Sequence, residues 1–155
     1  MKVLSAAFAL SLLASVALAA SQPAEERAAQ KALPKARDPF WTTLHTTQIK
    51  EDARRGMFIA VHSPQVKALA GQTLTVSGFM LPIEADTTTT HFLLSKYTPV
   101  CPFCPPGQPN EFVEVRTNRP VKAGYDLIKV SGRFALQSNG EQGMFFRLDG
   151  ASVVR

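Results

Sequence analysis

Cysteine is scarce in this chain of 155 residues, which contains only Cys101 and Cys104. A closed structural zinc site needs four ligands, and the sequence has no second C-x-x-C pair that could complete one. Phosphate-binding loops, dinucleotide fingerprints and nucleophile motifs are also absent from the sequence. We therefore expect a protein that is not an enzyme, unless the two cysteines supply the chemistry.

Clusters of positive charge are lacking too, although the formal net charge is +5. Arg54 and Arg55 are the only adjacent pair of basic residues. A nucleic-acid groove needs clustered lysine and arginine with aromatic side chains between them. The charge pattern therefore argues against nucleic acid as a partner.

Long apolar runs are missing after the N-terminal segment, so we expect no stable insertion into a membrane. The N-terminal segment itself combines Met1-Lys2, an apolar stretch rich in Ala and Ser, and an A-x-A sequence at 17–19. These are the features of a cleavable signal peptide. We predict a signal peptide over residues 1–19 and a monomeric periplasmic protein after cleavage.

The next segment, residues 20–38, is rich in Ala, Gln and charge and has Leu33 as its only large apolar residue. Such a composition buries too little surface to order itself, so we predict a flexible linker with a short helix over 24–32. Residues 39–155 are enough for one domain with its own core. Three apolar side chains at its start are expected to pack onto it: Phe40, Trp41 and Leu44.

Residues 45–70 show no clear period, and we predict them to be irregular with one short helix. That helix is expected within SPQVKALAG, residues 63–71. Ser63 can cap it, Pro64 suits the first helical position, and Gly71 can end it.

From about residue 72 onward apolar and polar residues alternate, which predicts strands. Five such stretches occur, at residues 72–83, 90–97, 110–117, 125–136 and 143–154. Two of them contain Val-Ser-Gly, ending at Gly78 and Gly132, and a glycine within a strand permits the strong coiling that a small barrel needs. We predict an all-β fold: a small five-stranded antiparallel barrel of the OB-like type, with an open β-sandwich as the alternative.

Three stretches resemble a known family: VSGFMLPIE, HFLLSKYTPVCPFCPPGQPNEFVEV and VSGRFAL. Together they are similar to the DUF3299-type group of small exported bacterial proteins of unknown function, over about residues 58–154. The resemblance implies an OB-like domain and an accessory role in envelope metal handling or transport. Many sequences of this type carry a histidine before the Pro-Pro run, where this chain has Phe103 and Cys104.

The stretch CPFCPPGQPNE, residues 101–111, allows three interpretations. The first is structural, because a Cys101–Cys104 disulfide is the default state of a cysteine pair in an exported chain. Prolines around the pair would stiffen the loop, and a stiff loop loses little entropy when it binds a partner. The residues expected to contact an envelope protein or a transporter component are Tyr97, Phe103, Pro105, Pro106 and Asn110.

Metal binding is the second interpretation, because two thiolates can chelate zinc or cuprous copper. His91 and His62 are the expected additional ligands, and His45 or Glu111 are further candidates. Thiol-disulfide exchange is the third. It lacks support because two prolines follow Cys104, whereas a reactive cysteine normally opens a helix that lowers its pKa.

The sequence thus favours a non-catalytic periplasmic binding or accessory protein that acts through its Pro-rich cysteine loop. Direct binding of zinc or copper and thiol redox chemistry are the alternatives.

Overall fold

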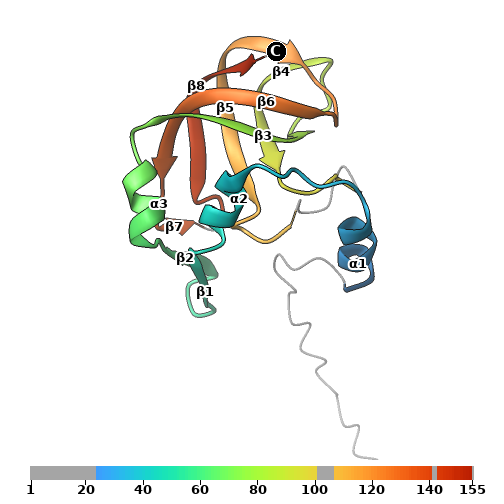
Figure 1. Ribbon diagram of the computed structural model, residues 1–155. Coiled ribbons are helices and arrows are strands. Elements are labelled where there is room, and N and C mark those ends of the chain that lie inside the picture. Colours follow the sequence, from blue (N-terminus) through green and yellow to red (C-terminus); the bar gives the residue numbers. More distant parts are fainter. Residues whose placement is uncertain (1–23, 101–106, 141–142, 155) are drawn as a thin grey trace, which may run out of the picture.

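Five long strands form the main body of the molecule. The computed structural model describes residues 24–100, 107–140 and 143–154. The five strands close into a barrel (Figure 1): β3 (Thr73–Pro82), β4 (Thr88–Ser95), β5 (Phe112–Lys122), β6 (Leu127–Leu136) and β8 (Phe146–Val154). Each overlaps one of the alternating stretches, although β5 continues to Lys122, past the predicted end at residue 117. The all-β class and the five-stranded OB-like barrel are confirmed, and the open β-sandwich is wrong.

One feature of the barrel differs from the prediction, because the strands are not all antiparallel. Around the ring the order is β3-β4-β5-β8-β6, and β5 pairs with β8 in parallel. The reason is arithmetical: a closed ring with an odd number of strands cannot alternate direction at every step. The hairpin that leads from β6 into β8 makes those two antiparallel, which leaves the parallel pairing between β8 and β5.

Glycines in β3 and β6 allow close approach of neighbouring segments. At Gly78, an added Cβ would lie 2.7 Å from the Cγ of Leu94 and 2.9 Å from the carbonyl oxygen of Ser95. This is also where β3 changes partner, since it pairs with β6 up to Phe79 and with β4 from Phe79 onward. An added Cβ at Gly132 would meet that of Ala151 at 2.9 Å. Both glycines therefore stand where the strands crowd together.

A short helix, α2 (Pro39–Leu44), packs its apolar side chains into the core at one end of the barrel. Asp38 caps it, because Oδ1 accepts the N–H of Phe40 at 3.0 Å, and its Oδ2 accepts the N–H of Ser77 at 3.1 Å. The indole N–H of Trp41 donates to the Ser77 carbonyl at 2.8 Å. Phe40, Trp41 and Leu44 are all buried in the core, as expected.

A small second sheet, missed by the sequence patterns, lies beside the barrel end. Strands β1 (Gln48–Asp52) and β2 (Met57–Val61) form an antiparallel hairpin, and β7 (Asn139–Gly140) adds to β2. The predicted short helix is present as α3 (Pro64–Leu69), and the Ser63 hydroxyl caps it by accepting the N–H of Val66 at 3.3 Å. Figure 1 shows the hairpin at the bottom of the molecule and the C-terminal end of β8 at the top.

Residues 24–38 differ from the linker that their composition predicted. Helix α1 (Ala24–Ala32) has the predicted bounds, and its Gln30 is fully buried. The segment after it contacts the barrel, since the N–H of Ala36 donates to the carbonyl of Lys96 at 2.8 Å. Hydrogen bonds and one small apolar side chain, rather than large apolar residues, make these contacts.

Among all the residues that the structure describes, no helix is long and apolar enough to cross a bilayer.

Candidate functional site

The connection between β4 and β5 contains both cysteines, and we name residues 101–106 of it the cysteine segment. Cys101, Phe103, Cys104, Pro105 and Pro106 lie outside the described residues, so the disulfide, the thiolate ligands and the contacts expected of them stay predictions. The residues on both sides, 96–100 and 107–111, are described. The site can therefore be built from these two flanks.

Tyr97 is buried, which makes its expected outward position wrong. Only 8 % of its surface is exposed, and its backbone bridges to Lys35. The guanidinium of Arg27, on α1, lies 4.7 Å from the ring centroid, a cation–π distance. Burial raises the pKa of Tyr97, and the Glu111 carboxylate adds to the rise. Helix α1 packs over the ring and thereby keeps Tyr97 from pointing outward.

Glu111 is the residue that holds the two flanks together. Its carboxylate is almost fully buried, accepts the N–H of Gln108 at 2.8 Å and forms an ion pair with Arg27. Its backbone N–H donates to the Gln108 carbonyl at 2.8 Å, and its carbonyl accepts the N–H of Lys96 at 2.9 Å. One residue thus connects the end of β4, the start of β5 and helix α1.

Asn110, the other expected contact residue that is described, is also buried. Its Nδ2 donates to the carbonyl of Thr47 at 3.4 Å. Its Oδ1 is buried without a hydrogen-bond partner within the described part of the chain. Asn110 therefore helps to pack the base of the connection, and its contact with a partner stays a prediction.

His45 follows α2 and lies beside Glu111. Its Nε2 is 3.6 Å from Oε1 of Glu111 and 3.0 Å from Nζ of Lys96. An ammonium group can only donate a hydrogen bond, so His45 Nε2 accepts this one and carries no proton. Burial lowers the pKa of His45, and the charge of Lys96 lowers it further. The ring is therefore a neutral base.

We name the Glu111 cluster for its five members: Arg27, Lys35, His45, Lys96 and Glu111. Burial lowers the pKa of Lys96, and the neighbouring charges of Lys35 and Arg27 act in the same direction. With His45 neutral, three cations face one carboxylate. The cluster therefore carries an excess of positive charge.

His62, one of the two expected metal ligands, serves the fold. It is buried, and its Nε2 donates to the Gln137 carbonyl at 2.6 Å. Its Nδ1 lies 3.4 Å from the hydroxyl of Thr47, and its ring packs edge-on against Phe146 at 5.4 Å. Both ring nitrogens thus have partners inside the protein.

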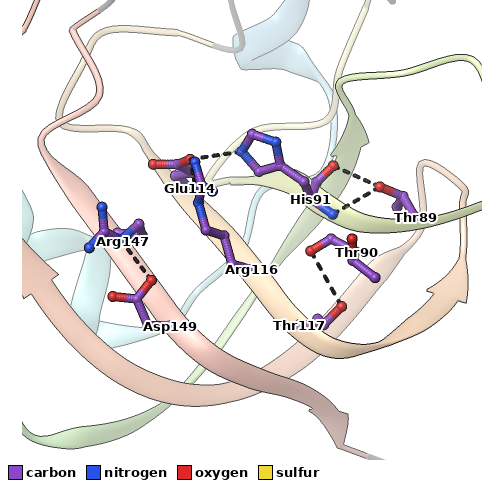
Figure 2. A network of polar contacts seen from close by, with 8 residues as sticks. All are labelled: Thr89, Thr90, His91, Glu114, Arg116, Thr117, Arg147 and Asp149. Atoms are coloured by element: carbon purple, nitrogen blue, oxygen red, sulfur yellow. Dashed lines mark hydrogen bonds and ion pairs between the residues drawn. The ribbon is translucent and has the colours of Figure 1, made fainter.

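His91, the second expected ligand, belongs to a separate polar network on the outer face of β4, β5 and β8 (Figure 2). Its Nε2 donates to Oε1 of Glu114 at 2.7 Å, and Arg116 binds the same oxygen through two nitrogens at 2.7 Å and 3.0 Å. On the next strand Arg147 donates to Asp149 at 2.7 Å, a hydrogen bond that raises the pKa of Arg147. This network balances charge across neighbouring strands.

The two expected histidine ligands are therefore in different places, one beneath the small sheet and one on the barrel face. No group of three or more His, Cys, Asp or Glu residues suited to hold a metal ion occurs among the residues that the structure describes. Zinc or copper binding remains a prediction, because both thiolates fall outside those residues.

Comparison with known proteins places the chain in a family. The family model described as protein of unknown function (DUF3299) matches residues 16–147, most of the sequence. The chain belongs to the DUF3299 family. A crystal structure of another family protein, from Pseudomonas aeruginosa PAO1, matches with a TM-score of 0.50 and 20 % identity, over 87 % of this chain and 83 % of that chain. At this identity the match supports the shared fold. No curated protein matches the chain.

Sequence reasoning missed the Glu111 cluster as a unit, although it considered His45 and Glu111 singly. Arg27 and Glu111 are 84 positions apart in the sequence, and no local pattern connects them. The one local sign was on the predicted helix, where Arg27 and Gln30 lie three positions apart and share a hydrogen bond of 3.0 Å.

Proposed function

We propose that this DUF3299 protein is an exported, non-catalytic binding protein of the cell envelope. Its contact face is the end of the barrel that carries the Glu111 cluster and the cysteine segment. The observation that carries the proposal is the buried Glu111, whose carboxylate joins the flank after that segment to α1 and whose backbone carbonyl binds Lys96 on the flank before it. An arrangement of this kind fixes the base from which the segment departs.

A fixed base favours binding because association must pay for ordering the groups at an interface. Two backbone hydrogen bonds already close the connection at Glu111. Prolines at positions 99, 102, 105, 106 and 109 restrict the backbone of the segment and its flanks further. The two flanks are thus ordered before a partner binds, which lowers the cost of forming an interface there.

The charge of the cluster indicates the chemistry of the partner. Lys35, Lys96 and Arg27 outnumber the single carboxylate of Glu111, and complementary potentials steer proteins together and select the right partner. We therefore infer an acidic surface on the envelope protein or transporter component that binds here.

Site-specific photocrosslinking in the native host tests this proposal. Phe103 is replaced by a benzophenone analogue of phenylalanine, and Thr73, exposed on β3, receives the same analogue as the control. We expect one crosslinked product of defined mass from position 103 and none from position 73. The charge reversals Lys35→Glu and Lys96→Glu together should reduce its yield, whereas Lys50→Glu with Lys67→Glu should not. No product at 103, or the same product from both positions, would overturn the proposal.

Direct metal binding is a second candidate, favoured by the position of His45. Of the three histidines, His45 is the one beside the flanks of the cysteine segment, and its lowered pKa leaves the ring neutral, the form that binds metals. A zinc or cuprous ion held by Cys101 and Cys104 would therefore take His45, rather than His91 or His62, as a further ligand.

Competitive titration of the reduced protein with zinc, and separately with cuprous ion, tests this candidate. His45→Ala should weaken binding by about tenfold or more, since removal of even a supporting group costs that much. His91→Ala, the matched control, should have no effect. This candidate would be wrong if the reduced protein bound neither metal, or if only His91→Ala lowered the metal affinity. Native mass spectrometry of the isolated protein would show a loss of two hydrogens if the cysteines form a disulfide.

A further inference from the structure

Strands β5 and β8 separate before either of them ends. Their parallel ladder stops at the pair Thr117 and Ala151, whereas β5 continues to Lys122 and β8 to Val154. On their other sides, β8 stays paired with β6 up to Val154, while β5 leaves its ladder with β4 after Arg116 and rejoins it only at Val121 and Lys122. Two strand edges without a ladder partner among the described strands therefore face one opening, which we name the β5–β8 slot (Asn118–Lys122 and Ser152–Val154).

Two adjoining hollows lie in the slot. One, of about 440 Å³, is lined by apolar side chains that include Met80, Val121, Ile128 and Val153. The other, of about 390 Å³, runs along Asn118 and shares Val121 and Val153 with the first. The two hollows thus adjoin at two apolar side chains, Val121 and Val153, which line both.

Apolar side chains are exposed at the same end of the barrel. Tyr125 is 49 % exposed and Leu127 is 54 % exposed, on the turn and strand that follow β5. Val153 and Val154, at the end of β8, are each 38 % exposed. Exposed apolar side chains beside a hollow mark an interaction site more often than scattered ones do.

Positive charge dominates the walls of the slot. Lys122 lines the larger hollow and Arg119 the smaller one, while Asp126 also lines the larger. Lys129 is exposed on β6, opposite Val154 in the ladder. A ligand with carboxylate groups would complement these walls.

We propose that the β5–β8 slot binds an extended peptide segment of a partner protein, with alternating apolar and acidic residues, that pairs with the free edge of β8 at Ser152–Val154, because Pro120 leaves the facing edge of β5 without one N–H donor. Backbone hydrogen bonds to an open strand edge supply affinity, and pockets for every second side chain supply selectivity. The apolar side chains of the segment would rest on Val121 and Val153, and its carboxylates would meet Arg119 and Lys122.

This surface is distinct from the one proposed above. β5 begins next to Glu111 at Phe112 and reaches the slot at Asn118, and these six residue steps span roughly 20 Å at about 3.3 Å per residue. The slot would therefore recognise a second segment or a second protein.

Amide hydrogen exchange of the full mature protein, followed by NMR, tests the proposal with two capped peptides. The probe has the sequence Glu-Val-Thr-Val-Glu, and the control has lysine in place of both glutamates. The probe should slow exchange at least tenfold at amides within 118–122 and 152–154, and the lysine peptide should do so less. No slowing at millimolar probe, equal slowing by both peptides, or slowing elsewhere in the chain would overturn the proposal.

Matched variants separate the slot from unspecific apolar binding. Val153→Asp places a carboxylate in the slot and should weaken binding of the probe about tenfold, whereas Val61→Asp, at a site 46 % exposed on β2, should leave it unchanged. Circular dichroism shows whether both variants are folded, and Arg119→Glu provides a surface variant if Val153→Asp is not. If the same amides become protected with rising protein concentration and no peptide, a second copy occupies the slot and the proposal is wrong.

Discussion

Glu111 and Arg27 depend on each other for charge balance inside the protein. The carboxylate is 2 % exposed, and removal of one partner from a buried ion pair leaves the other charge uncompensated. Glu111→Gln should therefore lower the free energy of unfolding by about 2 to 4 kcal/mol. Glu51→Gln, on the exposed side of β1, should change it by less than about 0.5 kcal/mol. Urea unfolding of both variants measures the difference, and equal midpoints would show that the pair contributes nothing.

The space around Gly78 is too small for a side chain. A methyl group there would press on Leu94 and on the backbone of Ser95 at distances below 3.0 Å. Gly78→Ala should destabilise the protein by about 1 to 3 kcal/mol, the usual cost of overpacking. At Gly124 the nearest atom to an added Cβ is Oδ2 of Asp126 at 3.4 Å, so Gly124→Ala should be close to neutral. Thermal unfolding of the two variants provides the comparison.

His45 should make stability depend on pH. Burial, and then Lys96, lower its pKa below the ordinary value of 6.5, so the unfolded chain binds this proton more readily than the folded protein does. The stability that His45 contributes is complete above pH 6.5 and is lost as the pH falls from there through the folded pKa. His45→Gln should therefore lose less stability than the wild type between pH 7 and pH 5. Equal decreases in the urea midpoints of the wild type and His45→Gln over this pH range would contradict this expectation.

Helix α1 provides a test at the level of elements. Deletion of residues 24–32 removes Arg27 from Glu111 and uncovers the ring of Tyr97. The melting temperature should fall by several degrees, because about 1 kcal/mol shifts it by 4–8 °C or somewhat less in a domain of this size. Iodination of Tyr97 should become faster. If 24–32 were only a linker, neither quantity would change.

The elements that the sequence predicted well are those with a clear period or a local cap. The five barrel strands alternate, and α3 has Ser63 and Pro64 at its start. The β1–β2 hairpin was missed for the opposite reason: Gln48–Asp52 has Ile49 as its only apolar residue, and Met57–Val61 is apolar throughout. Neither strand therefore shows the alternation of apolar and polar residues by which a half-buried strand is recognised.

At the scale of the whole molecule, strand β8 closes the barrel. It pairs with β5 on one side and β6 on the other. Removing β8 therefore leaves β5 and β6 each without a partner on one side and opens the ring. A chain truncated after Gly143 should lose the dispersed NMR spectrum of a folded domain. A chain truncated after Ala151 should keep it, because that deletion removes only residues beyond the β5–β8 ladder. A folded spectrum from the shorter chain would show that closure is dispensable.

Strand order and the candidate site lay beyond sequence reasoning for one common reason. Alternation shows which residues face the core, but the neighbour of each strand depends on contacts between residues far apart in the chain. The parallel β5–β8 pairing and the Arg27–Glu111 ion pair are both of this kind. The outward position expected of Tyr97 was wrong because α1 covers its ring.

The separation of the two surfaces limits where the protein can be labelled. The end of β8 at Val154 borders the slot, and α1 carries Arg27, which contacts Glu111 and Tyr97, so a tag next to either element would be close to a proposed surface. The turn between β1 and β2, residues 53–56, is exposed and belongs to neither surface. Exposed loop tips tolerate insertion, so an epitope placed in this turn would report on both surfaces without blocking either.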